Sequence, residues 1–561
     1  MGHHPTRQAR LSRHFPVTVG GTLCSMRTPW KILATALFAA ATCAGAFFGD
    51  QLLARPDDQT RDTLRVYTEL VNRAHELYAE DVSYRDLVFA SIDGMLRTLD
   101  PHTNFLSPKA YTGMRERQQS SFYGLGILVA MRNGHLTVIT PIEGTPASKM
   151  GLRAGDIIHR IEGEETESMS VDEAIDKLKG PKGTQVNIEI VRRGLSEPLK
   201  LTVTRAEIPQ TTVRYAYMLD KETGFIWLTD FNRSSSEEMA TALSQLKKLG
   251  MKRLIFDLRN NGGGLLDQAI AIADQFVPKD SLIVETRGRT PDSRQSFTAE
   301  GNYPVLGVPV VVLVNHGTAS AAEIVSGAIQ DHDVGLIVGV PTWGKGLVQT
   351  VFNLPYGAGL ALTTAKYYTP SGRLIQRDYT SYYDYYTSTP DPSAADGKVA
   401  HTPAETFKTD LGRPVYAGGG ITPDVSAENE ELSTFEQFLL ARNAFLDFAV
   451  DYLRDPEHAK AVSSPAFRTN SAILEPFQAW LVKEGLVTAE QATKGFAESK
   501  HPDYVVRMVS GELLNARFGI EAQHRALAEG DSVIQKALSL FPQARELLAQ
   551  RQAEALDATR H

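Results

Sequence analysis

The chain has very few cysteines, and their positions exclude two kinds of chemistry. Only Cys24 and Cys43 occur in 561 residues, and both lie before residue 50. The rest of the chain therefore forms no disulfide bonds and carries no thiol nucleophile. Metal-binding patterns are absent as well, because the sequence has no HExxH motif and no cysteine cluster. Neither a metal nor another cofactor is predicted.

The sequence also lacks an excess of positive charge. Its formal net charge is −8 and its isoelectric point is near 6.0, and no basic stripe runs through it. Nucleic-acid binding is therefore not predicted. Internal repeats are absent too, and a chain of this length is expected to hold more than one domain.

The N-terminus has the pattern of a targeting segment. Five basic residues precede an apolar run, Ile32–Phe48, that contains no charged side chain. This run is short for a membrane span, and Ala44 to Ala46 offer the small side chains of a cleavage site. We predict that residues 1–46 are a signal peptide or a membrane anchor. The protein is then extracytoplasmic, either periplasmic or secreted, or associated with the inner membrane through this segment.

The most informative stretch runs from Val314 to Gln349. Before it, Leu306–Val314 is an apolar, β-branched run typical of a buried strand, and helical spacing of apolar residues begins at Ile324. Ser320 therefore lies where a strand passes into a helix. The next amide, that of Ala321, is a helix N-terminal donor without an intrahelical acceptor. Nucleophilic serines favour such a place because the new oxyanion needs a donor beside it.

The second half of this stretch offers a base. Lys345 lies between two glycines, after a second short apolar strand, Gly335–Val340. A lysine activates a serine only when it is neutral, so its pKa must fall from about 10.4 through desolvation. Trp343 and Leu347 could exclude water, and the neutral Gln349 could hold the lysine nitrogen. From these features alone, an ordinary α/β core with a surface lysine fits equally well.

A family resemblance separates these alternatives. The sequence GTASAAEIVSGAIQD, followed by VGVPTWGKGLVQ, resembles the active-site block of the carboxy-terminal processing peptidases, the tail-specific serine proteases. The resemblance implies that Ser320 is the nucleophile, Lys345 its general base and Gln349 the residue that orients the lysine. Family members often have serine where Thr318 and Ala322 stand, but neither position is the nucleophile.

The same resemblance implies an oxyanion hole. The sequence DLRNNGGG, which ends at Gly264, matches the family's DLRNNxGG element, with Gly262 where proline is frequent. In the family a glycine amide here forms half of the hole. We assign this role to Gly263, with its neighbours as open alternatives, and the other half to the Ala321 amide. Asp331 matches an acidic position that supports activity in some relatives, and a structural carboxylate at a helix end is the alternative.

Two histidines offer other interpretations. His316 precedes Ser320 by four residues and invites a Ser–His pairing, but no acidic partner accompanies it, so a loop residue is the simpler interpretation. His102 follows Pro101 in the stretch GMLRTLDPHTNFLSPKAY, which resembles the helical segment before the binding domain of the same peptidases. We interpret His102 as a capping or turn residue.

Residues in the first half of the chain have the pattern of a PDZ domain. Gly124, Leu125, Gly126 and Ile127 precede a strand, and later strands alternate apolar and polar residues. The sequence PASKMGLRAGDII adds to a resemblance over nearly the full length of that domain. Exposed amides of the glycine-flanked loop could hold a terminal carboxylate while a peptide adds as a strand beside Ile127–Met131.

The predicted fold class is multidomain α+β. The resemblance points to a crotonase-like α/β protease core with a PDZ domain, and both ends of the chain are predicted to be helical. A polar, tyrosine-rich insertion within the core is predicted to be a mobile surface loop. The predicted boundaries are 50–117 for the N-terminal helical region, 118–206 for the PDZ domain, 207–427 for the core with the insertion at 378–415, and 428–561 for the C-terminal helical region.

The resemblance implies a serine endopeptidase whose partners are protein or peptide substrates with accessible C-termini. The alternative is a non-catalytic PDZ scaffold on a protease-like fold. Loss of Ser320, Lys345 or a glycine of the hole would mark that alternative, and all of them are present. The C-terminal helices are typical of segments that pack, that form a homo-oligomer or that cover a site.

Overall fold

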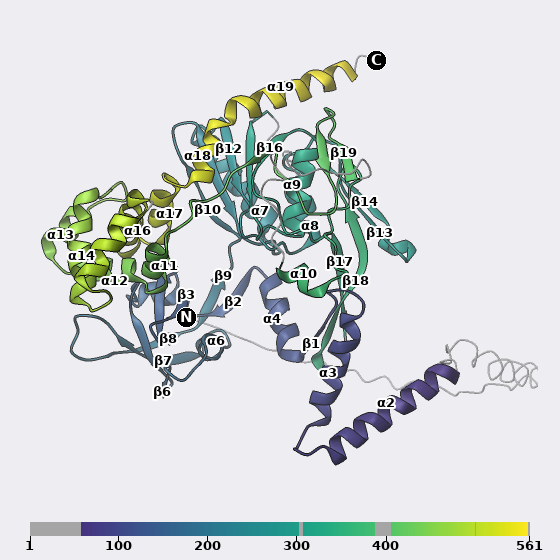
Figure 1. Ribbon diagram of the computed structural model, residues 1–561, viewed down its shortest axis with the longest axis horizontal. Helices are drawn as coiled ribbons and strands as arrows, with labels where there is room; N and C mark the ends of the chain where they lie inside the picture. Colours follow the sequence, from purple (N-terminus) through teal and green to yellow (C-terminus); the bar gives the residue numbers. More distant parts are fainter. Residues whose placement is uncertain (1–57, 302–306, 388–404, 500, 559–561) are drawn as a thin grey trace, which may run out of the picture. The chain divides into compact units, whose positions relative to one another are not determined.

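The computed structural model describes the chain except for residues 1–57, 302–306, 388–404, 500 and 559–561 (Figure 1). The predicted signal peptide or anchor, residues 1–46, lies outside the described residues. Among the residues that are described, no helix combines the length and the apolar character needed to cross a membrane. The chain divides into two units, residues 1–92 and 93–561. The first contains helix α2 (Asp58–Leu77) and the start of α3 (Tyr84–Arg97).

A six-stranded, mostly parallel sheet forms the centre of the second unit. Its strand order is β10-β11-β12-β15-β16-β21, and only β10 pairs antiparallel with its neighbour. Every residue of β15 and β16 is buried, as expected for parallel strands covered on both faces. The bounds are β10 (Val213–Met218), β11 (Thr223–Leu228), β12 (Arg253–Asp257), β15 (Val310–Val314), β16 (Gly335–Gly339) and β21 (Val425–Ser426).

Helices cover both faces of this sheet (Figure 1). On one face, apolar side chains of α7 (Ser235–Lys248), α8 (Leu266–Ala273) and α9 (Ala321–Asp331) share a buried cluster with the strands. On the other face, α18 (Ser532–Ser539) and α19 (Phe541–Ala558) bury their apolar side chains against β12, β15 and β16. The last helices of the chain therefore complete the core of the sheet.

A second sheet is antiparallel. Its order is β1-β18-β13-β14, and β17 pairs with β18. The loop that contains Lys345 leads directly into β17. The bounds are β1 (Asn104–Leu106), β13 (Leu282–Gly288), β14 (Gln295–Thr298), β17 (Leu347–Asn353) and β18 (Gly359–Tyr368).

A separate six-stranded sheet lies in the sequence between β2 (Ser121–Gly124) and β9 (Ala206–Pro209) and has its own apolar core. Its order is β3-β4-β5-β7-β8, with β6 beside β5, so that β3 is an edge strand. Two short helices complete it. The bounds are β3 (Ile127–Arg132), β4 (His135–Pro141), α5 (Pro146–Lys149), β5 (Ile157–Ile161), β6 (Glu164–Glu165), α6 (Val171–Leu178), β7 (Gln185–Val191) and β8 (Leu199–Thr204).

A helical cluster with a third core follows β21. Aromatic side chains such as Phe445, Phe477 and Trp480 fill it. Its helices are α11 (Thr434–Ala441), α12 (Ala444–Tyr452), α13 (Pro456–Ala461), α14 (Leu474–Lys483), α15 (Ala489–Glu498), α16 (Pro502–Phe518) and α17 (Ile520–Ala528).

The described parts of the insertion at 378–415 are mostly exposed, as expected, but they are not a loop throughout. Residues Tyr382–Thr387 form helix α10, and Tyr385 on it is buried, with 1% of its surface exposed. After the undescribed residues, β19 (Thr406–Lys408) pairs with β20 (Pro414–Tyr416). The polar, tyrosine-rich composition concealed this burial because a tyrosine ring packs in a core once its hydroxyl has a partner.

Candidate active site

Three predicted site residues, Gly263, Ser320 and Lys345, lie on the loops that follow β12, β15 and β16. The carboxyl ends of parallel strands meet at one edge of a sheet, where sites of α/β proteins commonly form. Hydrogen bonds join the loops: the Ala319 amide donates to the Asn261 carbonyl oxygen at 2.9 Å, and the Trp343 amide donates to that of Thr318 at 2.9 Å. The Thr318 hydroxyl also donates to the carbonyl oxygen of Leu258 at 2.8 Å.

Ser320 immediately precedes α9 and has an unusual backbone conformation. Its φ is 57° and its ψ is −118°, a region that non-glycine residues rarely adopt. Such strain costs roughly 1–3 kcal/mol and is concentrated at functional sites. The Ser320 side chain is partly exposed. In the described part of the chain no acceptor takes the Ala321 amide, which leaves this donor available beside the serine.

Gly263 lies directly against the serine. Its φ is 93°, and a Cβ added to it would come within 2.8 Å of the Ser320 Cβ and of the Ala321 amide nitrogen. Only glycine fits there. The Gly263 amide, however, donates to Asn261 Oδ1 at 2.9 Å in this structure. The glycine loop is therefore placed for an oxyanion hole, but the amide that we assigned to it already has an acceptor.

Lys345 is partly buried at the start of the last loop. Burial lowers the pKa of its ammonium group from the ordinary value near 10.5, and the charges of Glu323 and Asp100 act in the opposite direction. Within the described residues, no hydrogen bond joins its side chain to Ser320 or to Gln349. The side-chain amide of Gln349 instead donates to the Thr363 hydroxyl at 3.3 Å. The predicted contact between Gln349 and the lysine nitrogen is thus not formed in this structure.

The analysis of the sequence missed the central place of Glu323. Its buried carboxylate accepts hydrogen bonds from the amides of Ser320 at 2.7 Å and of Lys345 at 2.9 Å. It therefore connects the two loops that carry the predicted dyad. One signal was present: a serine followed three residues later by a glutamate is the pattern of a helix capping box.

An aromatic cluster surrounds the Tyr385 hydroxyl. His102 Nε2 lies 2.5 Å from the Tyr385 hydroxyl, and the Trp343 ring nitrogen donates to that hydroxyl at 3.2 Å. The Arg377 guanidinium lies over the Trp343 ring, 5.0 Å from its centre. Burial, and then the charge of Lys345, lower the pKa of His102 to about 4.

Two other candidates have structural partners. Asp331 is buried at the end of α9, where it pairs with Arg373 at 2.7 Å and accepts the Ser371 amide at 3.0 Å. These contacts do not reach Ser320 or Lys345. His316 has its Nδ1 atom 2.7 Å from the Pro341 carbonyl oxygen, an interaction that fixes the loop rather than the serine.

The residues predicted to bind a peptide carboxylate lie between β2 and β3. Gly126 has a φ of 79°, and a Cβ on it would lie 2.3 Å from the Thr145 side chain. Among the described residues, no acceptor takes the backbone amides of Leu125 or Gly126. Gly124 ends β2 and Ile127 begins the edge strand β3, whose outer side has no neighbouring strand in the described sheet.

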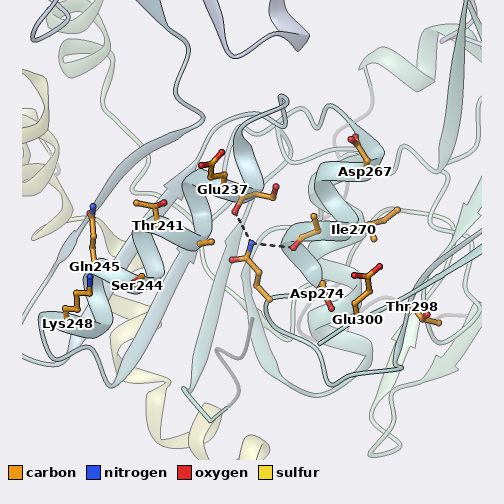
Figure 2. A pocket seen from close by; sticks show the side chains of 14 residues that line it. Glu237, Thr241, Ser244, Gln245, Lys248, Asp267, Ile270, Asp274, Thr298 and Glu300 are labelled. Atoms are coloured by element: carbon orange, nitrogen blue, oxygen red, sulfur yellow. Dashed lines mark hydrogen bonds between the residues drawn. The ribbon is translucent and has the colours of Figure 1, made fainter. Parts of the chain in front are cut away.

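A cavity of about 800 Å³ lies apart from these loops, between α7 and α8 (Figure 2). Its lining carries the carboxylates Glu237, Asp267, Asp274 and Glu300 and none of the predicted site residues. On its wall, the Gln275 amide donates to carbonyl oxygens of both helices. The size of this cavity alone does not make it a site.

Comparison with known families agrees with the fold. The pattern of peptidase family S41 matches residues 222–382, and that of the PDZ domain matches residues 137–192. The first match spans all three loops, and the second lies within the sheet that follows β2.

Individual relatives extend these matches. The chain is 37% identical over 324 residues to a carboxy-terminal-processing protease of Bartonella bacilliformis. The aligned region covers 57% of this chain and 74% of that protein. It is 40% identical over 301 residues to a carboxyl-terminal-processing protease of Synechocystis sp., with 52% and 69% covered. A solved photosystem II D1 C-terminal processing protease is 33% identical, with 54% of this chain and 83% of that one covered and a TM-score of 0.33.

Proposed function

This chain belongs to peptidase family S41 and is a serine-type protease with a PDZ domain. On that premise, we propose that it cleaves proteins with a Ser320–Lys345 dyad after its PDZ domain has bound their C-terminal ends. The observation that carries the proposal is the meeting of three loops at one edge of the parallel sheet. That meeting brings Ser320, the open Ala321 amide and the glycine loop together.

The first chemical step needs a neutral lysine. Burial lowers the pKa of Lys345, so the amine can take the proton of the Ser320 hydroxyl at a lower pH than an exposed lysine could. The serine oxygen then forms a bond to the carbonyl carbon of the scissile peptide. The carbonyl electron pair moves to its oxygen, which becomes the tetrahedral oxyanion.

Donors beside the serine stabilise this oxyanion. The Ala321 amide is open to it, and the glycine loop supplies the second donor, which is the Gly263 amide once it leaves Asn261. Collapse of the intermediate breaks the C–N bond, and the protonated lysine gives its proton to the leaving amine. Water then attacks the ester at Ser320, with Lys345 again accepting a proton, and releases the new C-terminus.

Two features support recognition by the PDZ domain. The amides of Leu125 and Gly126 have no acceptor among the described residues, and no strand pairs with the outer side of β3 in the described sheet. A peptide can therefore pair with β3 while its terminal carboxylate accepts those amides. The upstream part of the same protein would then be available to Ser320.

The basic N-terminus and the apolar run after it support an extracytoplasmic site of action, which we propose on that sequence pattern alone. Fractionation of cells that express the full chain, with a variant lacking residues 1–46 as control, tests it. The full chain should leave the cytoplasm and the truncated chain should stay there. Full-length protein that remained entirely in the cytoplasm would contradict this proposal.

The test of the proposed activity is digestion of an unstructured protein with an apolar C-terminus. The wild type, Ser320→Ala and Lys345→Ala should be compared as folded proteins. We expect cleavage by the wild type alone, and loss of a general base typically costs about 10²–10⁴-fold in rate. If the wild type is silent, a free C-terminal peptide is added to occupy the PDZ domain. Normal cleavage by Lys345→Ala would show that the dyad is wrong.

A further inference from the structure

Glu323 holds the only charge that contacts both loops of the proposed dyad among the described residues. Its side chain is fully buried, with 0% of its surface exposed. One carboxylate oxygen, Oε2, accepts the amides of Ser320 at 2.7 Å and Lys345 at 2.9 Å. The other, Oε1, accepts the Thr342 hydroxyl at 2.5 Å and the Gly344 amide at 2.8 Å. Four donors from two separate loops thus meet at one carboxylate.

The donors favour the ionised form of this carboxylate. Three of them are backbone N–H groups, which only donate. The fourth is the Thr342 hydroxyl, which also accepts the Ile421 amide at 2.7 Å. A protonated glutamate could direct its hydrogen only at the Thr342 oxygen, because the other three groups have no acceptor. Burial raises the pKa of Glu323, and the four hydrogen bonds oppose that effect by stabilising the charged form.

A second buried side chain contacts the same two residues through their carbonyl groups. The Tyr367 hydroxyl, on β18, lies 3.1 Å from the Ser320 carbonyl oxygen and also hydrogen-bonds the Lys345 carbonyl oxygen. Only 1% of the Tyr367 surface is exposed. The amides of both residues therefore donate to Glu323, and their carbonyl oxygens share the single proton of the Tyr367 hydroxyl.

We propose that Glu323 and Tyr367 are positioning residues that hold the backbone of Ser320 and the backbone of Lys345 at a fixed separation. This inference rests on the proposed Ser–Lys mechanism. Neither side chain needs to touch substrate, because each acts through the two peptide groups that it joins. A fixed separation matters because a displacement of 1 Å at reacting atoms can cost about 10²-fold in rate.

The charge of Glu323 has a second consequence, which a purely structural residue would lack. It faces Lys345 and favours the charged ammonium, as does Asp100, while the lysine in turn lowers the pKa of His102. Tyr367 and Tyr385 are the other titratable groups that sense Glu323, and both have raised pKa values. Removing the charge of Glu323 therefore lowers the pKa of Lys345. Because the neutral amine is the active form, the rise of activity with pH moves to lower pH.

The decisive variant is Glu323→Gln, with Glu436→Gln as its matched control. Glu436 has the same place at the start of α11, is equally buried, and accepts the Ser433 amide at 2.7 Å, but it lies in the helical cluster away from the dyad. Both variants should be assayed for kcat as a function of pH with a short ester substrate, after their folding has been checked by circular dichroism. The ester needs no PDZ binding.

We expect kcat of Glu323→Gln to fall about 10²-fold and its rise with pH to shift to lower pH, while Glu436→Gln keeps the wild-type profile. A folded Glu323→Gln enzyme with the wild-type kcat and the wild-type pH dependence would overturn the proposal. A Lys345→Ala variant in the same assay separates the two proposals. If it retains the wild-type rate, the dyad itself has failed.

Tyr367→Phe provides an independent test if Glu323→Gln does not fold. This variant removes one hydroxyl and keeps the buried ring, so we expect a fall of roughly tenfold in kcat with no shift of the pH profile. Its control is Tyr217→Phe, because the buried Tyr217 hydroxyl contacts His524 Nδ1 at 3.0 Å, outside the three loops. Equal kcat values for both tyrosine variants and the wild type would overturn the positioning role of Tyr367.

Discussion

Two helices of this molecule begin with the same pattern, a serine followed three residues later by a buried glutamate, and they use it differently. At α11 the Ser433 hydroxyl accepts the Glu436 amide at 3.3 Å, and Ser433 has an ordinary extended backbone. At α9 the Glu323 amide donates instead to the Ser320 carbonyl oxygen at 2.8 Å, and Ser320 has a positive φ. The Ser433 hydroxyl thus caps its helix, whereas at α9 the Ser320 carbonyl oxygen takes the corresponding amide.

The two glutamates differ in the origin of their donors. Glu436 binds the start of its own helix and the Ser499 hydroxyl. Glu323 binds the start of its helix and three groups of the following loop, from Thr342 to Lys345. A local cap has become a connection between nucleophile and base. The comparison teaches that the same local pattern becomes part of a reactive site when its glutamate also binds a distant loop.

The largest expected difference between the two helix starts is in catalysis. Ser320→Ala should reduce kcat on the order of 10⁶-fold, because the nucleophile is lost. Ser433→Ala should leave kcat unchanged and lower the free energy of unfolding by about 1 kcal/mol, the usual value of an N-cap. Ester hydrolysis and urea denaturation measure the two effects. Equal losses of activity in the two variants would contradict the different roles of the two serines.

The opposite end of α9 should respond in stability alone. Asp331→Asn breaks a buried pair with Arg373 and should lower the free energy of unfolding by about 3 kcal/mol. The pH at which activity rises should not change, because Asp331 has no contact with Lys345 in the described structure. Urea denaturation and a kcat–pH profile test this. A displaced profile in a folded variant would show that Asp331 supports catalysis.

The smallest expected effect is the pH dependence of the α11 cap. Despite burial, hydrogen bonds from Ser499 and Ser433 lower the pKa of Glu436 below its usual value near 4.5. The unfolded state therefore binds the proton first, and the stabilisation is present above the unfolded pKa and is lost as pH falls through the folded pKa. Glu436→Gln should show a shallower loss of stability between about pH 5 and about pH 3. An unchanged slope would contradict this.

Local pattern was enough to predict part of the site. The change from β-branched residues to helical spacing located Ser320 and the Ala321 amide, because both are properties of neighbouring residues in the chain. The approach of Gly263 to Ser320 followed from the family resemblance, and the structure brings them together.

The rest depended on contacts between distant segments. The donors to Glu323 come from a loop about twenty residues away, and no local rule brings that loop to the start of α9. Gln349 contacts Thr363 because β17 pairs with β18 in a register that the sequence of one strand does not specify. Tyr385 is buried because its hydroxyl meets His102 and Trp343, which composition alone does not show.

The most direct test of the dyad is the rate at which a small activated ester acylates Ser320, measured as a function of pH in the wild type and in Lys345→Ala. The ester enters without the PDZ domain, so the measurement reports on the serine and its base alone. We predict that the wild-type rate rises with pH around a midpoint below 10.5, the ordinary lysine value, because burial lowers the pKa of Lys345. In Lys345→Ala the acylation rate should be much lower than in the wild type and should not rise with pH around this midpoint. A Lys345→Ala enzyme that is acylated at the wild-type rate, with the same dependence on pH, would contradict a lysine base.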